Sequence, residues 1–327
     1  MKDKKLILID TDLGDDIDDA FALCLAMCSP EIELLGVTTV FRCASHRAKM
    51  AKALLRAGGF GNVPVHAGRS RPLACTTVHG REIDYGEAPK SYAEEYEDVL
   101  YDGDDAPDFL IEALERSARK ITIVTLGALT NIALVLQRRP DLYAKIECIT
   151  IMGGAFSMNW GEYNFCCDPD AAAFVLDSGL PIRCVGVDVT FCCKLSGELL
   201  DRVQTHPHPC LRMLGRMRKK WGGEVYLHDP LALMCAFDDR FVKWQPMVCA
   251  VESGGKYANG YVINLSDPNW RRDAAHSNLL VATSVDAEAF TREYVRRVSG
   301  FPGGDRRKDE ERHCVGHGMF DLGSVDV

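Results

Sequence analysis

Short apolar runs alternate with longer amphipathic segments through the first half of the chain. The runs lack the polar–apolar alternation of a half-exposed strand, which predicts strands that are buried on both faces. The segments between them repeat their apolar residues at helical spacing and end near Gly or Pro. This alternation predicts the α/β fold class, with a mainly parallel open sheet flanked by helices. The predicted strands are residues 6–9, 34–39, 63–65, 121–126, 148–152 and 182–187, and the predicted helices are residues 19–27, 46–57, 108–118, 131–137 and 170–177.

The second half of the chain has a less regular pattern. Its last segment is rich in Gly and charged residues and contains few apolar ones. We therefore expect one α/β domain over residues 1–300, followed by a polar, poorly ordered tail over residues 301–327. Within this half the predicted helices are residues 196–203, 211–221, 229–236 and 287–298, and the predicted strands are residues 247–251, 261–265 and 279–284.

Composition excludes several classes of partner. The 327 residues carry a formal charge of −9 and contain no basic block, which argues against binding to nucleic acid or to an anionic membrane. No apolar stretch approaches the roughly 20 residues that a membrane-spanning helix requires. The 14 cysteines are scattered and form no CxxC pair, so we expect reduced thiols rather than a disulfide framework. These features predict a cytoplasmic enzyme.

The segment LILIDTDLGDDIDDA (residues 6–20) gives the strongest indication of chemistry, because six aspartates follow an apolar strand within ten residues. The later four could solvate a loop or cap the next helix. Asp10 and Asp12 follow the strand directly, at the carboxyl edge of the sheet, where ligands bind. Carboxylates that converge there stay ionised only if a cation or strong donors compensate them, and oxygen ligands favour calcium or magnesium. The six are Asp10, Asp12, Asp15, Asp16, Asp18 and Asp19.

Two further segments could contribute to a metal site. The tripeptide His228-Asp229-Pro230 is weak evidence alone, because Asp before a helical Pro is a common helix cap and a single His is more often structural. The segment ITIVTLGALTN (residues 121–131) runs from a strand into a glycine turn and a helix. A backbone carbonyl near Leu126 could bind a metal there.

The segment IMGGAFSMNWGEYN (residues 151–164) ends a strand in two glycines and continues with polar side chains. The glycines permit close approach of the backbone to a ligand. Asn159, Glu162 and Asn164 could bind hydroxyl groups, or they could belong to an ordinary polar loop.

Taken together, these segments resemble the inosine-uridine-preferring nucleoside hydrolase family over about residues 5–298. DTDLGDDIDDA is similar to the family's N-terminal aspartate motif, with two extra residues between the glycine and the final Asp pair. TLGALTNIA, IMGGAF, EYN before CCDPDAA, and HDP follow in the family's order. The resemblance implies the family's α/β fold and an enzyme that hydrolyses the N-glycosidic bond of ribonucleosides to free base and ribose. It also suggests a homodimer or homotetramer that acts on a small molecule.

The resemblance assigns a role to each site residue. Asp12 would activate a metal-bound water, His228 would assist the leaving base, and Asp10 would support the metal ligands without binding the ion. The calcium ligands would be the side chains of Asp12, Asp19 and Asp229 and the main-chain oxygen of Leu126. The ribose hydroxyls would be bound by Asp18, Asn159, Glu162 and Asn164.

The sequence departs from the family pattern at three places. Family members commonly carry Gly-Asn shortly after the second strand, where this chain has Arg42 and Cys43. Arg42 allows the hypothesis of a modified or negatively charged ribosyl substrate. The loop between Gly154 and Glu162 is shorter than usual, and the insertion in the aspartate motif leaves the alignment of its middle aspartates open. The preferred base is therefore not predicted.

Two other interpretations are compatible with parts of the sequence. Haloacid-dehalogenase-like phosphatases also begin with a strand that ends in DxD, as Asp10 and Asp12 do, and they use a later strand-end Thr, where Thr125 stands. Such an enzyme would use Asp10 as its nucleophile together with magnesium, but it leaves the later motifs without a role. A calcium- and ribose-binding protein without turnover is compatible with Cys43.

Overall fold

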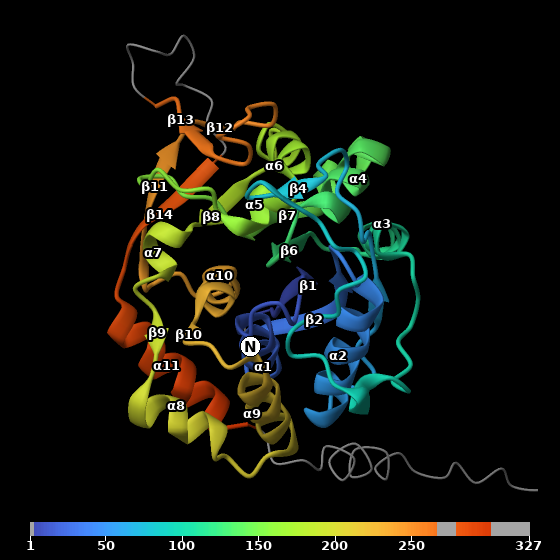
Figure 1. Ribbon diagram of the computed structural model, residues 1–327, viewed down its shortest axis with the longest axis vertical. Coiled ribbons are helices and arrows are strands. Elements are labelled where there is room, and N and C mark those ends of the chain that lie inside the picture. Colours follow the sequence, from blue (N-terminus) through green and yellow to red (C-terminus); the bar gives the residue numbers. More distant parts are fainter. Residues whose placement is uncertain (1–2, 267–278, 302–327) are drawn as a thin grey trace, which may run out of the picture.

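The strand β1 (Lys5–Thr11) lies between β6 and β2 in an eight-stranded sheet, and its residues Ile7, Leu8 and Ile9 are fully buried. The computed structural model describes residues 3–266 and 279–301 (Figure 1). The strand order is β11-β14-β8-β7-β6-β1-β2-β3, and each neighbouring pair is parallel except β11 and β14. The predicted fold class, a mainly parallel open sheet flanked by helices, is confirmed. The other strands are β2 (Ile32–Thr39), β3 (Val65–Ala67), β6 (Ile121–Thr125), β7 (Ile146–Met152), β8 (Ile182–Val185), β11 (Val242–Met247) and β14 (Leu279–Val285).

Two apolar cores lie on opposite faces of this sheet. Ile7 and Ile9 of β1 belong to one core and Leu8 belongs to the other, as expected for alternate residues of a strand. No helix within residues 3–266 and 279–301 is long and apolar enough to cross a membrane. The first core contains α1 (Asp18–Met27), α2 (Ala44–Ala57), α8 (Gly197–Gln204), α9 (Pro209–Trp221), α10 (His228–Cys235) and α11 (Ala287–Ser299), and the second contains α3 (Ala106–Arg116), α4 (Thr130–Arg138) and α6 (Pro169–Leu176).

The structure corrects the strand predicted at residues 247–251. Met247 ends β11, whereas β12 (Cys249–Val251) pairs with β13 (Val262–Asn264) in a separate two-stranded sheet. The predicted run crosses the break between the two strands, and residues 242–246 of β11 were not predicted, because Lys243, Gln245 and Pro246 interrupt the apolar pattern there. The tail predicted at residues 301–327 lies, apart from Phe301, outside the described residues. Short elements that were not predicted are β4 (Thr77–Val78), β5 (Arg81–Glu82), α5 (Tyr163–Cys167), α7 (Val187–Thr190), β9 (Lys194–Leu195) and β10 (Val225–Tyr226).

Helix α11 is fastened to α1 and to the segment before β2 by its last turns. The buried Tyr294 hydroxyl donates a hydrogen bond to the carbonyl of Phe21 at 3.0 Å. The buried Arg297 donates to both carboxylate oxygens of Glu31, at 2.8 and 2.9 Å, and to Glu293 at 2.7 Å. The Tyr294 contact thus connects α11 to α1, which begins with Asp18 and Asp19, and the Arg297 contacts connect α11 to the segment before β2.

Replacing Arg297 should destabilise the fold in a pH-dependent way. Arg297→Met should lower the free energy of unfolding by about 2 kcal/mol at neutral pH, because charge-assisted hydrogen bonds are lost. Hydrogen bonds from Arg296 and then Arg297 lower the pKa of Glu293 from 4.5 to about 2. A lowered carboxyl pKa contributes stability above 4.5 that is lost as the pH falls toward 2, so the difference from wild type should shrink on acidification.

Urea unfolding at a series of pH values measures this difference. The control is Arg292→Met on the same helix, which removes an exposed ion pair with Glu288 and should cost less than about 0.5 kcal/mol. Equal losses for the two variants, or a loss that does not change with pH, would contradict the role given to Arg297.

Candidate active site

The strands β1, β6 and β7 are parallel neighbours, so their carboxyl ends meet at one edge of the sheet. Asp12 follows β1, Leu126 follows β6, and Gly153 and Gly154 follow β7. Gly154 has a φ of +81°, a left-handed conformation that favours glycine. Three of the sequence motifs are therefore brought together by the sheet itself.

Asp10 lies within this edge and is fully buried. Its Oδ1 accepts hydrogen bonds from Thr38 at 2.5 Å and from Asn131 at 2.8 Å, and burial raises its pKa to about 6. Its Oδ2 has no hydrogen-bond partner among the residues that the structure describes. An enclosed carboxylate of this kind cannot reach a phosphate ester, so the position does not favour the phosphatase interpretation and is compatible with a supporting role.

Three buried carboxylates meet where α1 and α10 begin. Oxygen atoms of Asp18, Asp19 and Asp229 lie within 4.8 Å of one another. The backbone N–H of Asp229 donates to Asp18 Oδ2 at 3.0 Å across 211 positions of sequence, and the Thr11 hydroxyl donates to Asp19. Two helix N-termini at one point favour negative charge, which explains in part why the fold tolerates the cluster.

The three carboxylates cannot all be ionised without a further counter-charge. Burial, followed by repulsion from neighbouring aspartates, raises the pKa of Asp18 and Asp229 well above the usual range and raises that of Asp19 to about 8. At neutral pH the cluster must therefore hold protons or face a cation. A buried set of oxygen donors fits a hard divalent ion such as calcium or magnesium.

Asp12 lies close to this cluster without being part of it. It is almost fully buried, and burial followed by repulsion from Asp19 raises its pKa. Gly127 packs directly against Asp12, since a Cβ at position 127 would lie 2.9 Å from the backbone nitrogen of Asp12. The structure thus brings Asp18, Asp19 and Asp229 together, whereas the resemblance implies Asp12, Asp19 and Asp229 as carboxylate ligands.

Glu162 and Asn164 organise the segment after β7. The carboxylate of Glu162 caps α5 and accepts hydrogen bonds from three backbone N–H groups at 2.8–3.1 Å. Asn164 Nδ2 donates to the carbonyls of Leu126 and Met152, each at 3.1 Å. The carbonyl predicted as a metal ligand therefore lies beside an amide predicted to bind ribose.

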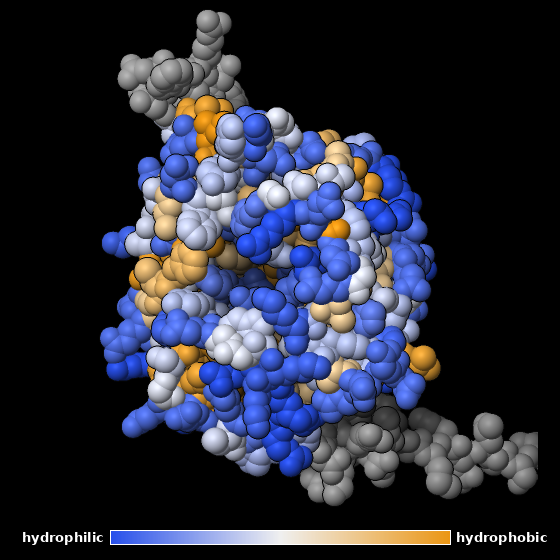
Figure 2. Space-filling model, viewed as in Figure 1, coloured by the Kyte–Doolittle hydropathy of each residue, from blue (hydrophilic) through white to orange (hydrophobic). Residues whose placement is uncertain are grey.

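A cavity of about 260 Å³ lies beside the carboxylate cluster. Figure 2 shows the molecule hollowed near the middle of this face, with apolar surface on one side. Asp16, Asp18, Glu162 and Asp229 line the cavity, and no Lys or Arg among the described residues does so. The exposed Asn159 does not line it. Asp12 and Asp19 are also absent from the lining.

His228 is the first residue of α10 and forms part of the cavity wall. Its Nδ1 lies 2.6 Å from the Thr190 hydroxyl. Its ring stacks on Tyr226 with centroids 5.6 Å apart and meets Phe191 edge-on at 5.2 Å. Burial lowers the pKa of His228 to about 4, so the imidazole is neutral at neutral pH.

His79 and Trp160 also line the cavity, and neither was identified from the sequence. His79 lies at the tip of the β4–β5 hairpin, and its Nε2 is 2.9 Å from the carbonyl of Gly161. His79 and Gly80 have φ angles of 49° and 75°, which is typical of a type I′ hairpin turn. The glycine after His79 is a turn signal, but strands of two residues are too short for a periodic pattern.

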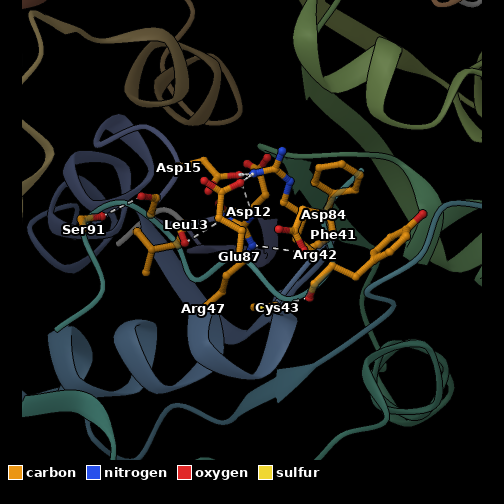
Figure 3. Close-up of polar contacts among 12 residues, drawn as sticks. Asp12, Leu13, Asp15, Phe41, Arg42, Cys43, Arg47, Asp84, Glu87 and Ser91 are labelled. Carbon is orange, nitrogen blue, oxygen red and sulfur yellow. Dashed lines mark hydrogen bonds and ion pairs between the residues drawn. The ribbon is translucent and has the colours of Figure 1, made fainter. Parts of the chain in front are cut away.

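The Arg42-Cys43 pair does not line the cavity beside the carboxylate cluster. Arg42 borders a neighbouring cavity of about 670 Å³, where its Nη1 is 3.1 Å from Glu87 and 3.8 Å from Asp15 (Figure 3). The Cys43 thiol donates to the carbonyl of Tyr85 at 3.2 Å. Arg42 and Cys43, which stand where family members commonly carry Gly-Asn, thus both contact other parts of the chain.

Comparison with known proteins finds relatives that match almost the whole chain. The chain is 33% identical to uridine nucleosidase 1 of Arabidopsis thaliana over 322 residues, which cover 90% of this chain and 93% of the relative. It is 30% identical to the pyrimidine-specific ribonucleoside hydrolase RihA of a Shewanella species, with 87% and 93% covered. The fold is similar to that of a purine-preferring ribonucleoside hydrolase from Gardnerella vaginalis, with a TM-score of 0.77, 28% identity and coverage of 91% of this chain and 99% of that chain.

The family described as inosine-uridine preferring nucleoside hydrolase matches residues 7–292. The match covers the aspartate motif, the strand-end glycines and the His-Asp-Pro segment. The resemblance found in the sequence and the predicted enzyme class, an N-ribosyl hydrolase, are both confirmed. The chain belongs to the inosine-uridine preferring nucleoside hydrolase family.

Proposed function

We propose that this protein uses calcium to hydrolyse the N-glycosidic bond of ribonucleosides, releasing free base and ribose. The observation that carries the proposal is the convergence of Asp18, Asp19 and Asp229 within 4.8 Å beside a cavity. Asp12, Asp19, Asp229 and the main-chain oxygen of Leu126 would hold the ion. When bound, calcium supplies a positive charge that orients the sugar hydroxyls and makes water easier to deprotonate.

Asp12 is the proposed general base, which accepts a proton from the attacking water. Its burial and its contact with Gly127 restrict the orientations that its carboxylate can adopt. Asp18, Glu162 and Asn164 are proposed to bind the ribose hydroxyls, and all three line the cavity. Carboxylates around the sugar also favour the positive charge that develops in the transition state.

His228 is proposed to assist the departing base. Its Nδ1 is paired with Thr190, so the other ring nitrogen is available to the cavity. A neutral imidazole can donate a hydrogen bond from that nitrogen to the base as the base leaves. Asn159 is exposed outside the cavity lining, and its ribose-binding role stays a prediction, as do the dimer or tetramer and the cytoplasmic location.

The proposed substrate is a plain ribonucleoside rather than a phosphorylated ribotide. Four carboxylates and no described Lys or Arg line the catalytic cavity. Arg42, which allowed the hypothesis of an anionic substrate, faces the carboxylates of Glu87 and Asp15 instead. A phosphate within this cavity would therefore meet negative charge.

Removal of the proposed base or of the ion should abolish turnover. Asp12→Asn keeps the size of the side chain and should lower kcat by about 1,000-fold, within the range for loss of a general base. Chelation should have a similar effect that added calcium reverses. A reducing-sugar assay on inosine, uridine, adenosine and cytidine measures both, with Asp170→Asn on α6 as the control.

Normal turnover in Asp12→Asn and after chelation would show that the proposed mechanism is wrong. Thermal stabilisation of the wild type by nucleosides and calcium, without product, would instead support the ribose-binding protein that lacks turnover.

Removal of the imidazole should matter only when the leaving group needs help. His228→Ala should lower kcat for uridine or inosine by about 100-fold, the lower range for a proton donor. Hydrolysis of p-nitrophenyl riboside, which releases a stable phenolate, should fall far less. Tyr226→Phe, which keeps the ring beside His228, is the control. Equal losses on both kinds of substrate would contradict a role in leaving-group departure.

A 5′-phosphate should weaken the reaction. For a nucleoside and its 5′-monophosphate, we expect kcat/KM to differ by at least about 100-fold in favour of the nucleoside, because like charges meet in the site. Arg42→Ala should leave this ratio unchanged. The opposite outcome is that the ribotide is hydrolysed as well as the nucleoside and that Arg42→Ala lowers kcat/KM for the ribotide alone. Arg42 would then be a phosphate-binding residue.

A further inference from the structure

The loop between β1 and α1, residues 12–17, has no regular secondary structure, although it carries Asp12 and leads directly into Asp18 and Asp19. Side chains from distant parts of the chain bind its backbone carbonyls. Ser91 donates to the carbonyl of Gly14 at 2.8 Å, and Trp221 donates to that of Asp15 at 3.1 Å. Long-range contacts thus fix the path of this loop.

Arg47 of α2 makes more contacts with this loop than either of those side chains. Its Nη1 donates to the carbonyls of Asp12 and, at 3.1 Å, of Leu13, while Nη2 donates to the Asp15 carboxylate at 2.7 Å (Figure 3). Its Nε donates to the carbonyl of Phe41 at 2.9 Å. The side chain is fully buried, and a guanidinium is stable there only if its charge and donors are compensated.

The hydrogen bond from Arg47 to the carbonyl of Phe41 links the loop of residues 12–17 to the turn after β2. Phe41 and Arg42 have φ angles of 68° and 51°, an unfavourable conformation for two successive residues with side chains. Their backbone N–H groups donate to the carbonyls of Arg69 and Ser70 at 2.7 and 2.8 Å. Arg47 therefore connects two neighbouring strand ends, one of which carries Asp12.

We propose that Arg47 is a positioning residue, which sets the place of the Asp12 carboxylate by holding the backbone carbonyls of Asp12 and Leu13. The Arg47 guanidinium donates to the backbone carbonyl of Asp12. The Asp12 carboxylate is therefore left to bind the ion and to accept a proton from water. Asp15 is the counter-ion, which gives one of the middle aspartates of the motif a physical role. Its carboxylate compensates a buried guanidinium that would otherwise be unpaired.

This proposal rests on the calcium-dependent function proposed above. The test compares Arg47→Met and Arg47→Lys with Lys52→Met in the full chain. Lys52 is a matched control, because it is also a buried cation on α2 and donates to the Val63 carbonyl at 2.9 Å and to Asp102 at 2.8 Å. None of these contacts of Lys52 involves the loop of residues 12–17.

Three measurements separate positioning from general stability. Calorimetric titration of the metal-free protein with calcium should show at least about 10-fold weaker binding in Arg47→Met, and kcat should fall about 100-fold with little change in KM, as for a misplaced catalytic group. Amide hydrogen exchange over residues 12–17 should be faster. Arg47→Lys should recover only part of these losses, because an ammonium lacks the fork of donors. Lys52→Met should lose thermal stability but keep the wild-type calcium affinity, kcat and loop exchange.

Calcium affinity, kcat and exchange that match those of Lys52→Met would overturn the proposal. Tighter calcium binding in Arg47→Met would also overturn it, because the guanidinium would then act only as a repelling charge. If Arg47→Met does not fold, Asp15→Asn replaces it and should accelerate exchange over residues 12–17. Absence of calcium binding and turnover in the wild type would count against the proposed function alone, since hydrogen exchange still tests Arg47.

Discussion

The crowding of buried carboxylates at the start of α1 and α10 is the constraint on which the rest of the site depends. Asp18, Asp19 and Asp229 share a volume too small for three unscreened charges. Two helix N-termini and the Thr11 hydroxyl offset part of this repulsion, and a bound cation would offset the remainder. A cluster of this kind costs stability in the absence of its ligand, which is typical of a functional site.

The parallel sheet is what makes this cluster possible. β1, β6 and β7 end at one edge, so a backbone carbonyl, a glycine turn and a run of aspartates meet without long loops. Asp229 follows Asp18 by 211 positions in the sequence, yet its backbone N–H donates a hydrogen bond to the Asp18 carboxylate. The irregular loop after β1 receives its shape from distant side chains, among which Arg47 links it to the turn after β2. Precision at the site thus comes from contacts between segments far apart in sequence.

The sequence predicts those parts of the structure that require a recognisable local pattern of residues. Continuous apolar runs identify the central strands, because a strand buried on both faces needs aliphatic residues throughout. The β4–β5 hairpin and His79 are missed, since two-residue strands have no period. The burial of Arg47 could not be predicted from the sequence, because an arginine within an amphipathic helix is usually exposed. Spacing alone could not bring Asp229 to the aspartate motif, so the expectation that it joins Asp12 and Asp19 depended on the family resemblance. The exposure of Asn159 depends on a loop conformation that no local pattern specifies.

A crystal structure of the protein grown with calcium tests the proposed metal site most directly. We expect one ion, coordinated by Asp12, Asp19, Asp229 and the carbonyl of Leu126, at the distances of about 2.3–2.6 Å that calcium–oxygen bonds require. An ion bound elsewhere, or a cluster that stays without an ion at saturating calcium, would contradict it.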